Sequence, residues 1–281
     1  MKKEATAYKH NPETLPSALQ QIPQLLEGKK PAVFLDYDGC LTHIVKDPDK
    51  AILSKKMRDT LQRLAQVCSV AIVSGRDRAN VANLVQLDNL YFAGSHGFDI
   101  SGPGNMHTEP GGAKDALPAL DRAEVELNSR LKHIAGAMVE RKRYAIAVHY
   151  RNVPEEHVAE LKRIVADVLQ KHHALKEGLG KKIIELKPNL NWHKGKAVLW
   201  LLSELGLDRP DIVPLYIGDD ITDEDAFAEL QGRGIGILVG EHDEKTAAEY
   251  RLENVEEVEE FLQKLTHHLS KNAHAGMEDN V

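Results

Sequence analysis

The run Ala32-Val33-Phe34-Leu35 leads directly into Asp36 and Asp38, and this feature most limits what the chain can fold into. Four apolar residues predict a buried strand, and Gly39 then predicts a turn. Side chains two residues apart in extended backbone lie on the same side, so we expect both carboxylates at one spot. Open α/β sheets bind ligands at the carboxyl ends of their strands. Taken alone, the run also fits a solvated turn, because Asp and Gly favour turns.

Two carboxylates held this close repel each other unless a cation or a proton lies between them. A hard cation that prefers oxygen ligands, such as Mg²⁺, suits such a pair. The sequence therefore predicts a ligand site with Mg²⁺ as its cofactor.

Strands and helices alternate on both sides of the chain's middle. The first part predicts, in order, a strand at 32–38, a helix at 54–66 capped by Ser54, a strand at 67–73, a helix at 78–85 and a strand at 90–93. The last part predicts a helix at 194–205, a strand at 212–217, a helix at 223–230, a strand at 234–239 and an amphipathic helix at 255–268. This order is typical of a doubly wound, Rossmann-like parallel sheet.

The middle of the chain has a different pattern. A Gly- and Pro-rich connector is expected at 101–112, followed by a helix at 117–135, a strand at 144–150, a helix at 154–171 and a strand at 182–186. These elements fit a small α+β insert better than more of the parallel sheet. We therefore expect a core domain at 1–112 and 190–281, with an inserted α+β domain at 113–189.

Composition excludes several classes of function. The 281 residues carry a formal net charge of −7, so no basic field favours nucleic acid or acidic membranes. No apolar run approaches the roughly 18 residues of a membrane span. Two cysteines make no disulfide scaffold, and the segment from Met1 to Asn11 lacks the apolar core of a secretory signal. We expect a cytoplasmic monomer with reduced thiols.

Other predicted strands of the core also end in polar residues. Ser74, Gly75 and Arg76 follow the second strand, and His96 follows the third. The strand at 212–217 ends in the acidic run 218–225, and Lys194 opens a helix. The carboxyl ends of parallel strands share one edge, so we expect these groups to meet there. Each has a simpler interpretation alone: a helix-start turn, a solvated acidic helix start or a surface lysine.

Read together, these groups indicate phosphoryl transfer. A carboxylate can attack phosphorus to form an aspartyl-phosphate, and a second carboxylate can protonate the leaving oxygen and then activate water. Mg²⁺ and a lysine would offset the charge of the transferring group. No Gly-x-x-x-x-Gly-Lys-Ser/Thr loop is present, which argues against a P-loop nucleotide hydrolase.

The order of these motifs resembles that of the haloacid dehalogenase-like phosphatases. The residues within the motifs are similar to those of trehalose-6-phosphate phosphatases. The similarity covers about residues 31 to 240, and its most specific part is the run from Gly218 to Phe227. The shorter matching motifs are Leu35 to Gly39, Ser74 to Arg76, His96-Gly97, His149 to Arg151, Glu185 to Pro188 and Lys194 to Ala197. The resemblance implies a haloacid dehalogenase-like core, a cap domain formed by the insert, and a phosphorylated disaccharide as substrate.

The resemblance also implies roles for matching residues. Asp36 would be the nucleophile and Asp38 the general acid and base, while Ser74 and Lys194 would hold the phosphoryl group. Asp36, the backbone carbonyl of Asp38, and Asp219 would bind Mg²⁺, supported by Asp220 or Asp223. Substrate contacts would come from two groups of residues, one in the core and one in the cap: Gly75, Arg76, His96 and Gly97, and Glu140, Lys142, Arg151 and Glu185.

Two positions depart from the family pattern. Cys40 stands where the family usually has a Thr that braces the second aspartate, and a thiol is a weaker hydrogen-bond partner. Cys40 beside the site also suggests an enzyme that is sensitive to oxidants. Asp99 stands where the family often has Glu, which shortens one expected substrate contact.

The leading hypothesis is a Mg²⁺-dependent phosphatase that converts trehalose 6-phosphate to trehalose and phosphate. The nearest alternative is a phosphatase of the same fold for sucrose phosphate or a glucosyl-polyol phosphate, because the cap determines the sugar. A regulatory phospho-acceptor domain uses similar acids but is usually half this length. A catalytically silent sugar-phosphate sensor would not need intact Asp36 and Asp38.

Overall fold

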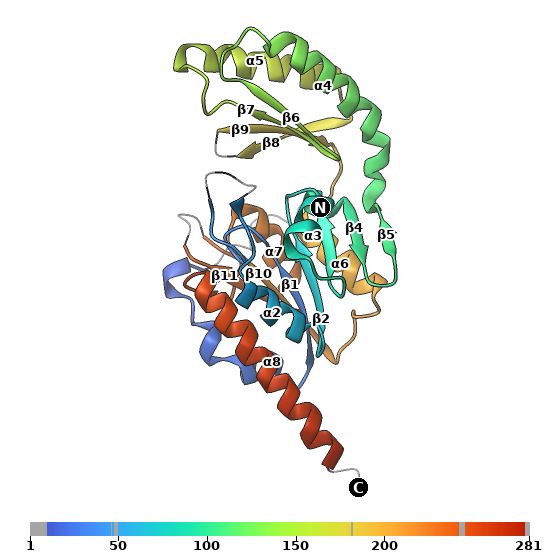
Figure 1. Ribbon diagram of the computed structural model, residues 1–281, viewed down its shortest axis with the longest axis vertical. Coiled ribbons are helices and arrows are strands. Elements are labelled where there is room, and N and C mark those ends of the chain that lie inside the picture. Colours follow the sequence, from blue (N-terminus) through green and yellow to red (C-terminus); the bar gives the residue numbers. More distant parts are fainter. Residues whose placement is uncertain (1–9, 46, 48–49, 181, 242–244, 279–281) are drawn as a thin grey trace. The chain divides into compact units, whose positions relative to one another are not determined.

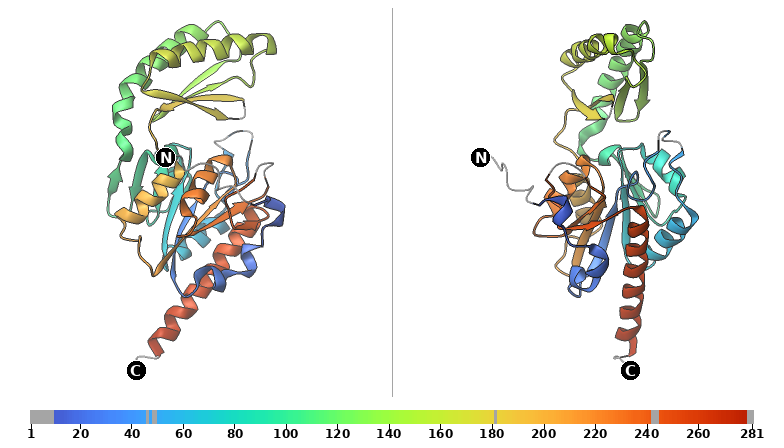
Figure 2. Two further views of the ribbon diagram at one scale, coloured as in Figure 1. Left: turned by 180° about the vertical axis from the view of Figure 1, so that it is seen from behind. Right: turned by 90° about the vertical axis from the view of Figure 1, so that its left-hand side faces the viewer.

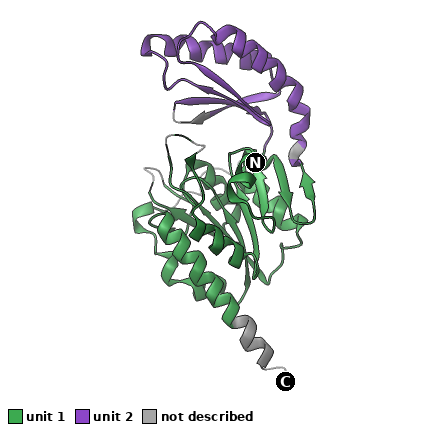
Figure 3. Ribbon diagram, viewed as in Figure 1, with its two compact units in different colours: residues 1–108, 192–281 green, residues 109–191 purple. Residues whose placement is uncertain are grey.

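The computed structural model describes residues 10–45, 47, 50–180, 182–241 and 245–278. Most of the segment from Met1 to Asn11, where we expect no secretory signal, lies outside the described residues. The chain divides into two compact units, residues 1–108 with 192–281 and residues 109–191 (Figure 3). The second unit is thus an insertion within the first.

Unit 1 is built on a mostly parallel sheet in the order β12-β11-β10-β1-β2-β3-β4-β5 (Figure 1). Its described strands are β1 (Lys30–Leu35), β2 (Ser69–Val73), β3 (Tyr91–Gly94), β4 (Asp99–Gly102), β5 (Met106–Thr108), β10 (Ile212–Gly218), β11 (Ile235–Val239) and β12 (Tyr250–Leu252). The strands from β12 to β3 run parallel, whereas β4 and β5 add antiparallel. Leu35 pairs with Ile217 on one side and Ile72 on the other, so the central strands end at one level.

Helices cover both faces of this sheet (Figure 2). They are α1 (Ile22–Leu26), α2 (Lys55–Leu64), α3 (Arg78–Val85), α6 (Lys194–Glu204), α7 (Glu224–Leu230) and α8 (Val255–Glu278). Short 3₁₀ helices lie at Pro12–Thr14, Ala18–Gln20, Ser95–Gly97 and Ile221–Asp223. Among the described residues, no helix is both long enough and apolar enough to cross a bilayer.

Strand alternation explains the two layers. Val33 and Leu35 of β1 pack in a buried cluster with residues of α2, α3 and α8. Ala32 and Phe34, which point the other way, pack in a second cluster with residues of α6 and α7. The Ser54 hydroxyl accepts the Met57 backbone N–H at 3.0 Å, which confirms the predicted cap of α2. The predicted doubly wound α/β core is therefore confirmed.

The structure corrects the sequence prediction at several elements. The expected connector at 101–112 contains most of a β4–β5 hairpin, which extends the sheet instead of merely leaving it. Strand β12 was not predicted, and α8 continues past the expected end at 268. In each case unit 1 has more residues in strands or helices than the local composition predicts.

Unit 2 has a four-stranded antiparallel sheet in the order β6-β7-β9-β8. Its strands are β6 (Met138–Lys142), β7 (Ala145–His149), β8 (Leu175–Gly180) and β9 (Ile183–Pro188); its helices are α4 (Leu117–Leu131) and α5 (Glu155–Lys171), with a 3₁₀ helix at Pro110–Ala116. The helices lie on one side of the sheet, and their apolar residues form one cluster with Ile146, Val148, Ile184 and Leu186 (Figure 1). The sequence pattern does not predict strands β6 and β8.

Candidate active site

Asp36 lies at the carboxyl end of β1, in the centre of the unit 1 sheet. Its backbone N–H donates to the Ile217 carbonyl at 2.9 Å, which continues the β1–β10 ladder by one residue. Its side chain is only 8% exposed. The fold thus places a carboxylate inside the protein at the edge where such sheets bind ligands.

Lys194 lies between two buried carboxylates. Its ammonium is 3.1 Å from Oδ1 of Asp36 and donates to Oδ1 of Asp223 at 2.8 Å. Burial by itself would lower the pKa of Lys194, but the charges of Asp223 and Asp36 outweigh it and raise the pKa above its ordinary value. Lys194, the first residue of α6, therefore keeps its positive charge at the site.

Asp223 holds the loop that follows β10. Its Oδ1 also accepts the Tyr216 hydroxyl at 2.6 Å, and its Oδ2 accepts the backbone N–H groups of Asp219 and Asp220 at 3.1 and 3.0 Å. A Cβ built on Gly218 would collide with the Asp223 carboxylate, so glycine is needed for this loop to close. Asp223 is fully buried and ties strand, loop and lysine together.

Sequence reasoning missed Tyr216. Strand alternation in β10 would have placed it on the same face as Gly218, two residues further on. A buried tyrosine hydroxyl needs a hydrogen-bond partner, and the acidic run supplies one. The missing step was the fold of the loop, which turns Asp223 back toward the strand.

Three carboxylates gather beside Lys194. One oxygen each of Asp36, Asp219 and Asp223 lies within 4.8 Å of the other two. Burial raises the pKa of Asp36 to about 7 against the opposing charge of Lys194, and burial and the charge of Asp36 raise the pKa of Asp219 to about 8. Oδ1 of Asp219 is buried without a hydrogen-bond partner. An oxygen-rich, acid-rich cluster with an unpaired buried oxygen fits a divalent cation.

The other two residues predicted to bind the metal are Asp220 and Asp38, the latter through its backbone carbonyl, and the carboxylates of both have hydrogen-bond partners outside this cluster. Asp220 is exposed, and its Oδ1 accepts the Ile221 N–H at 2.7 Å as a helix cap. The Asp38 carboxylate pairs with Arg76 through two hydrogen bonds of 2.7 Å. The expectation that both acids of the Asp36/Asp38 pair share one spot rested on extended backbone. The strand, however, ends at Leu35, and Gly39 (φ 79°) already lies in a turn.

The turn after β2 is braced by the segment after β3. Ser74 is buried; its hydroxyl accepts the Arg76 N–H at 3.1 Å, and its carbonyl accepts the His96 N–H at 2.9 Å. A Cβ on Gly75 would lie 2.9 Å from the His96 ring, and one on Gly97 would collide with Ala197. The fold brings Ser74, Gly75, Arg76, His96 and Gly97 together. At both glycine positions a side chain would be too close to a neighbouring residue.

Cys40 is a buried thiol of this region. It has no exposed surface, and its Sγ donates to the Ile217 carbonyl at 3.5 Å. Burial and the nearby Asp36 charge raise the pKa of Cys40 well above its ordinary value. A buried thiol that stays protonated is a poor target for oxidants, which argues against the oxidant sensitivity expected from the sequence.

The predicted cap residues lie in unit 2. Glu140 pairs with Ala147 across β6–β7, and Ala147 pairs with Glu185 across β7–β9, so the two carboxylates share one row of the sheet. Lys142 lies two residues from Glu140 and therefore on the same face. This face is opposite the apolar residues that pack on α4 and α5. Arg151 lies in the exposed turn after β7.

His149 and Lys187 extend this polar face. Nε2 of His149 is 2.7 Å from Oε2 of Glu140. A Cβ on Gly178 would lie 3.2 Å from Cε of Lys187 and 3.4 Å from Oε2 of Glu185, so glycine leaves room for these side chains. Both residues belong to motifs of the family resemblance, but the sequence predicts no role for them; the register of the strands places them on this face.

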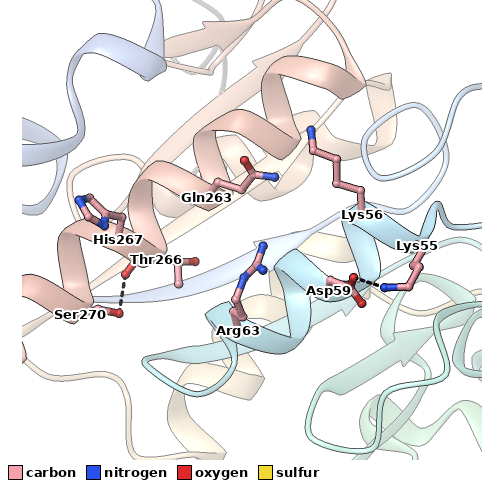
Figure 4. A pocket seen from close by; sticks show the side chains of 8 residues that line it. All are labelled: Lys55, Lys56, Asp59, Arg63, Gln263, Thr266, His267 and Ser270. Carbon is pink, nitrogen blue, oxygen red and sulfur yellow. Dashed lines mark hydrogen bonds and ion pairs between the residues drawn. The ribbon is translucent and has the colours of Figure 1, made fainter.

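A separate groove of about 740 Å³ lies between α2 and α8 (Figure 4). Its lining includes Lys56, Arg63, Gln263 and His267. None of the residues predicted for the site lines it, so the groove plays no part in the chemistry derived above.

Comparison with known proteins agrees with this geometry. The family model for trehalose-phosphatase matches residues 34–256. A trehalose 6-phosphate phosphatase of Zea mays is 44% identical over 271 residues, covering 90% of this chain and 75% of that protein. The chain therefore retains this similarity through both units.

Solved structures show the same fold. The C-terminal domain of trehalose-6-phosphate phosphatase from Candida albicans superposes with a TM-score of 0.74 at 25% identity, covering 90% of this chain and 98% of that one. A haloacid dehalogenase-like hydrolase from Bacteroides thetaiotaomicron has a TM-score of 0.62 at 17% identity, covering 84% and 100%. These findings confirm the resemblance seen in the motifs: the chain belongs to the trehalose-phosphatase family, whose fold is haloacid dehalogenase-like, and it is a phosphoric monoester hydrolase.

Proposed function

We propose that this protein hydrolyses trehalose 6-phosphate to trehalose and phosphate through an aspartyl-phosphate on Asp36. The observation that supports this proposal most is the cluster of buried Asp36, Lys194 and Asp223 with half-buried Asp219 at the carboxyl edge of the parallel sheet. A buried carboxylate beside a fixed ammonium is a suitable nucleophile, since the ammonium offsets the charge that a phosphoryl group brings.

The reaction proceeds in two steps. An oxygen of Asp36 attacks phosphorus, and the bond from phosphorus to the sugar oxygen breaks while Asp38 gives that oxygen a proton. Asp38 then takes a proton from water, which attacks the aspartyl-phosphate and releases phosphate. Lys194 and the Ser74 hydroxyl hold the phosphoryl oxygens through both steps.

Asp36, Asp219 and the backbone carbonyl of Asp38 would hold Mg²⁺, with Asp220 or Asp223 in support. The bound cation would supply positive charge for the phosphoryl oxygens. The unpaired Oδ1 of Asp219 and the raised pKa of Asp36 and Asp219 support this assignment, because a cation removes the mutual repulsion of the acids.

Unit 2 is proposed as the cap, with the insert taken as 113–189 and the core as 1–112 and 190–281. Its open sheet face presents Glu140, Lys142 and Glu185, and Arg151 lies in the turn nearby in the sequence. Sugar hydroxyls need several convergent charged or amide groups, and a phosphorylated sugar favours cations. Gly75, His96 and Gly97 would contact the substrate from the core.

The two cysteines of the chain, Cys40 and Cys68, are both free thiols, which suits a reducing compartment. We therefore propose a cytoplasmic monomer that acts on a phosphorylated disaccharide and binds neither nucleic acid nor membrane. The acidic net charge supports the last two exclusions.

A phosphate-release panel tests the activity. The substrates are trehalose 6-phosphate, sucrose 6-phosphate, glucose 6-phosphate and para-nitrophenyl phosphate, each with Mg²⁺ or with EDTA. We expect Mg²⁺-dependent release with a preference for trehalose 6-phosphate. Equal release from all sugar phosphates would refute the trehalose assignment.

The variant Asp36→Asn is the matched control. It is nearly isosteric and should fold, yet it should lower turnover by at least about 10⁴-fold because it removes the nucleophile. Full activity in Asp36→Asn would refute the aspartyl-phosphate route, whichever substrate is preferred.

A further inference from the structure

Asp38 is less enclosed by the protein than Asp36 and Asp223. It lies beyond the end of β1, and its side chain is 39% exposed, whereas the Asp36 side chain is 8% exposed. The nearby thiol of Cys40 donates to the Ile217 carbonyl. Something else must therefore fix the orientation of the Asp38 carboxylate.

Arg76 supplies that constraint. Its Nε donates to Oδ2 of Asp38 and its Nη2 donates to Oδ1, each at 2.7 Å. The guanidinium fork matches a carboxylate in this two-bond geometry, which fixes the plane of the acid as well as its position. Each carboxylate oxygen has two acceptor directions, so the pair leaves a second direction on each oxygen for water or a leaving oxygen.

Arg76 is itself held on several sides. Its backbone N–H donates to the Ser74 hydroxyl at 3.1 Å, and its carbonyl accepts the Ser95 N–H at 2.7 Å. Its Nη1 donates to Oδ1 of Asn80 at 3.1 Å, and its guanidinium carbon is 5.4 Å from the centre of the Tyr37 ring. The Arg76 side chain is only 12% exposed. An anchor fixed in this way can transmit its geometry to Asp38.

We propose that Arg76 is a positioning residue for Asp38, which it holds in the orientation needed for proton transfer to the sugar oxygen and from water. This inference rests on the proposed function, which gives Asp38 its acid–base role. It differs from the substrate contact expected for Arg76 from the sequence, because the guanidinium acts through another side chain. General acid–base catalysis depends on such placement, and small errors in position are costly.

Steady-state kinetics on trehalose 6-phosphate separate the two roles. We expect Arg76→Gln to lower kcat about 10- to 100-fold, as losses of orienting partners typically do, with KM changed less than about 3-fold. Arg76→Lys keeps the charge but loses the fork, so it should recover only part of kcat. A raised KM with unchanged kcat, or full recovery in Arg76→Lys, would overturn the positioning role.

The control variant is Arg58→Gln. Arg58 on α2 donates from Nε and Nη2 to the Val85 and Leu84 carbonyls, so its loss also removes two guanidinium hydrogen bonds. It should lower the melting temperature and leave kcat within about 2-fold of wild type. If Arg76→Gln behaves in the same way, Arg76 is only a stabilising residue and the proposal is wrong.

A double-mutant cycle gives the decisive measurement, with para-nitrophenyl phosphate as substrate because its good leaving group keeps slow variants measurable. If Arg76 acts through Asp38, Arg76→Gln should cost less than about 3-fold in an Asp38→Asn background. If the wild type is active and the losses in activity from Arg76→Gln and Asp38→Asn are additive, the positioning role of Arg76 is wrong while the proposed function stands. A wild type that releases phosphate from no substrate overturns the proposed function and this inference with it.

Discussion

The buried site of unit 1 and the polar sheet face of unit 2 use similar residues under opposite conditions. Asp36, Lys194 and Asp223 have side chains that are 8%, 3% and 0% exposed, and each is held by fixed partners. Glu140 and His149 also form a close pair, but their side chains are 47% and 25% exposed. Charges removed from water must be paired, whereas exposed charges keep their hydration and interact weakly. Unit 1 therefore holds a buried cluster of paired charges, and unit 2 presents a hydrated polar surface.

Removing the buried ammonium should have the largest effect. Lys194→Met leaves Asp36 and Asp223 buried without their cation, so we expect a loss of about 3–5 kcal/mol in stability together with loss of turnover. Chemical denaturation of the metal-free protein measures the first and phosphate release the second.

The matched test combines Lys194→Met with Asp223→Asn, which removes one of the two stranded charges. The double variant should be more stable than Lys194→Met alone. Strictly additive destabilisation would show that the buried charges are not energetically coupled, and the contrast between the two units would fail.

Glu109 is the exception within unit 2, because its side chain is only 3% exposed and contacts Lys114, Arg143 and Tyr144. Burial alone would raise its pKa, but hydrogen bonds from Lys114, Tyr144 and Arg143 lower the pKa to about 2. The folded state therefore binds this proton less readily than the unfolded state, whose pKa is about 4.5. The resulting stability is present above pH 4.5 and is lost as the pH falls toward 2.

We expect Glu109→Gln to destabilise the protein at neutral pH and to do so progressively less below pH 4.5. Hydrogen exchange within α4 and the sheet of unit 2 reports this locally. A cost that does not change with pH would mean that Glu109 acts through packing and not through its charge.

Metal removal probes the buried site without relying on turnover. Mg²⁺ at about 100 times its dissociation constant should stabilise the protein by about 2.7 kcal/mol, seen as a rise in melting temperature over the EDTA-treated sample. Asp219→Asn should reduce this rise. An equal rise in wild type and Asp219→Asn would place the cation elsewhere.

The smallest effect is expected on the exposed face. Glu140→Gln keeps shape and hydrogen-bonding capacity but loses charge, so we expect KM for trehalose 6-phosphate to rise about 10-fold, or about 1.4 kcal/mol, with kcat nearly unchanged. Activity on para-nitrophenyl phosphate, which lacks the sugar, serves as the control. A large fall in kcat on both substrates would contradict the division between the two units.

Much of the core could be predicted from the sequence, because its strands are apolar runs and its helices have clear periodicity. Strands β6 and β8 were missed since charged residues and glycines interrupt their alternation, and a sheet with one polar face tolerates both. The sequence predicts a connector in place of the β4–β5 hairpin because Gly102, Pro103 and Gly104 dominate its turn. Local composition predicts the turn, while the flanking strands depend on the pairing of β4 with β3 and of β5 with β4.

The candidate site likewise has parts that the sequence predicts and parts that it does not. The polar ends of aligned strands could be predicted, since topology alone sends them to one edge. The Tyr216–Asp223 and Arg76–Asp38 contacts could not, because they depend on how loops fold back after the strands end. Asp38 shows the limit clearly: a period of two holds only while the chain remains extended.

The sheet of unit 1 also has a consequence for behaviour at high concentration. Both of its outer strands, β5 and β12, are only three residues long. Long exposed edges offer a template on which other chains can add strands, and short ones do not. The long apolar strands of the centre are thereby kept from joining sheets between molecules, so this chain should resist aggregation as long as both edges remain in place.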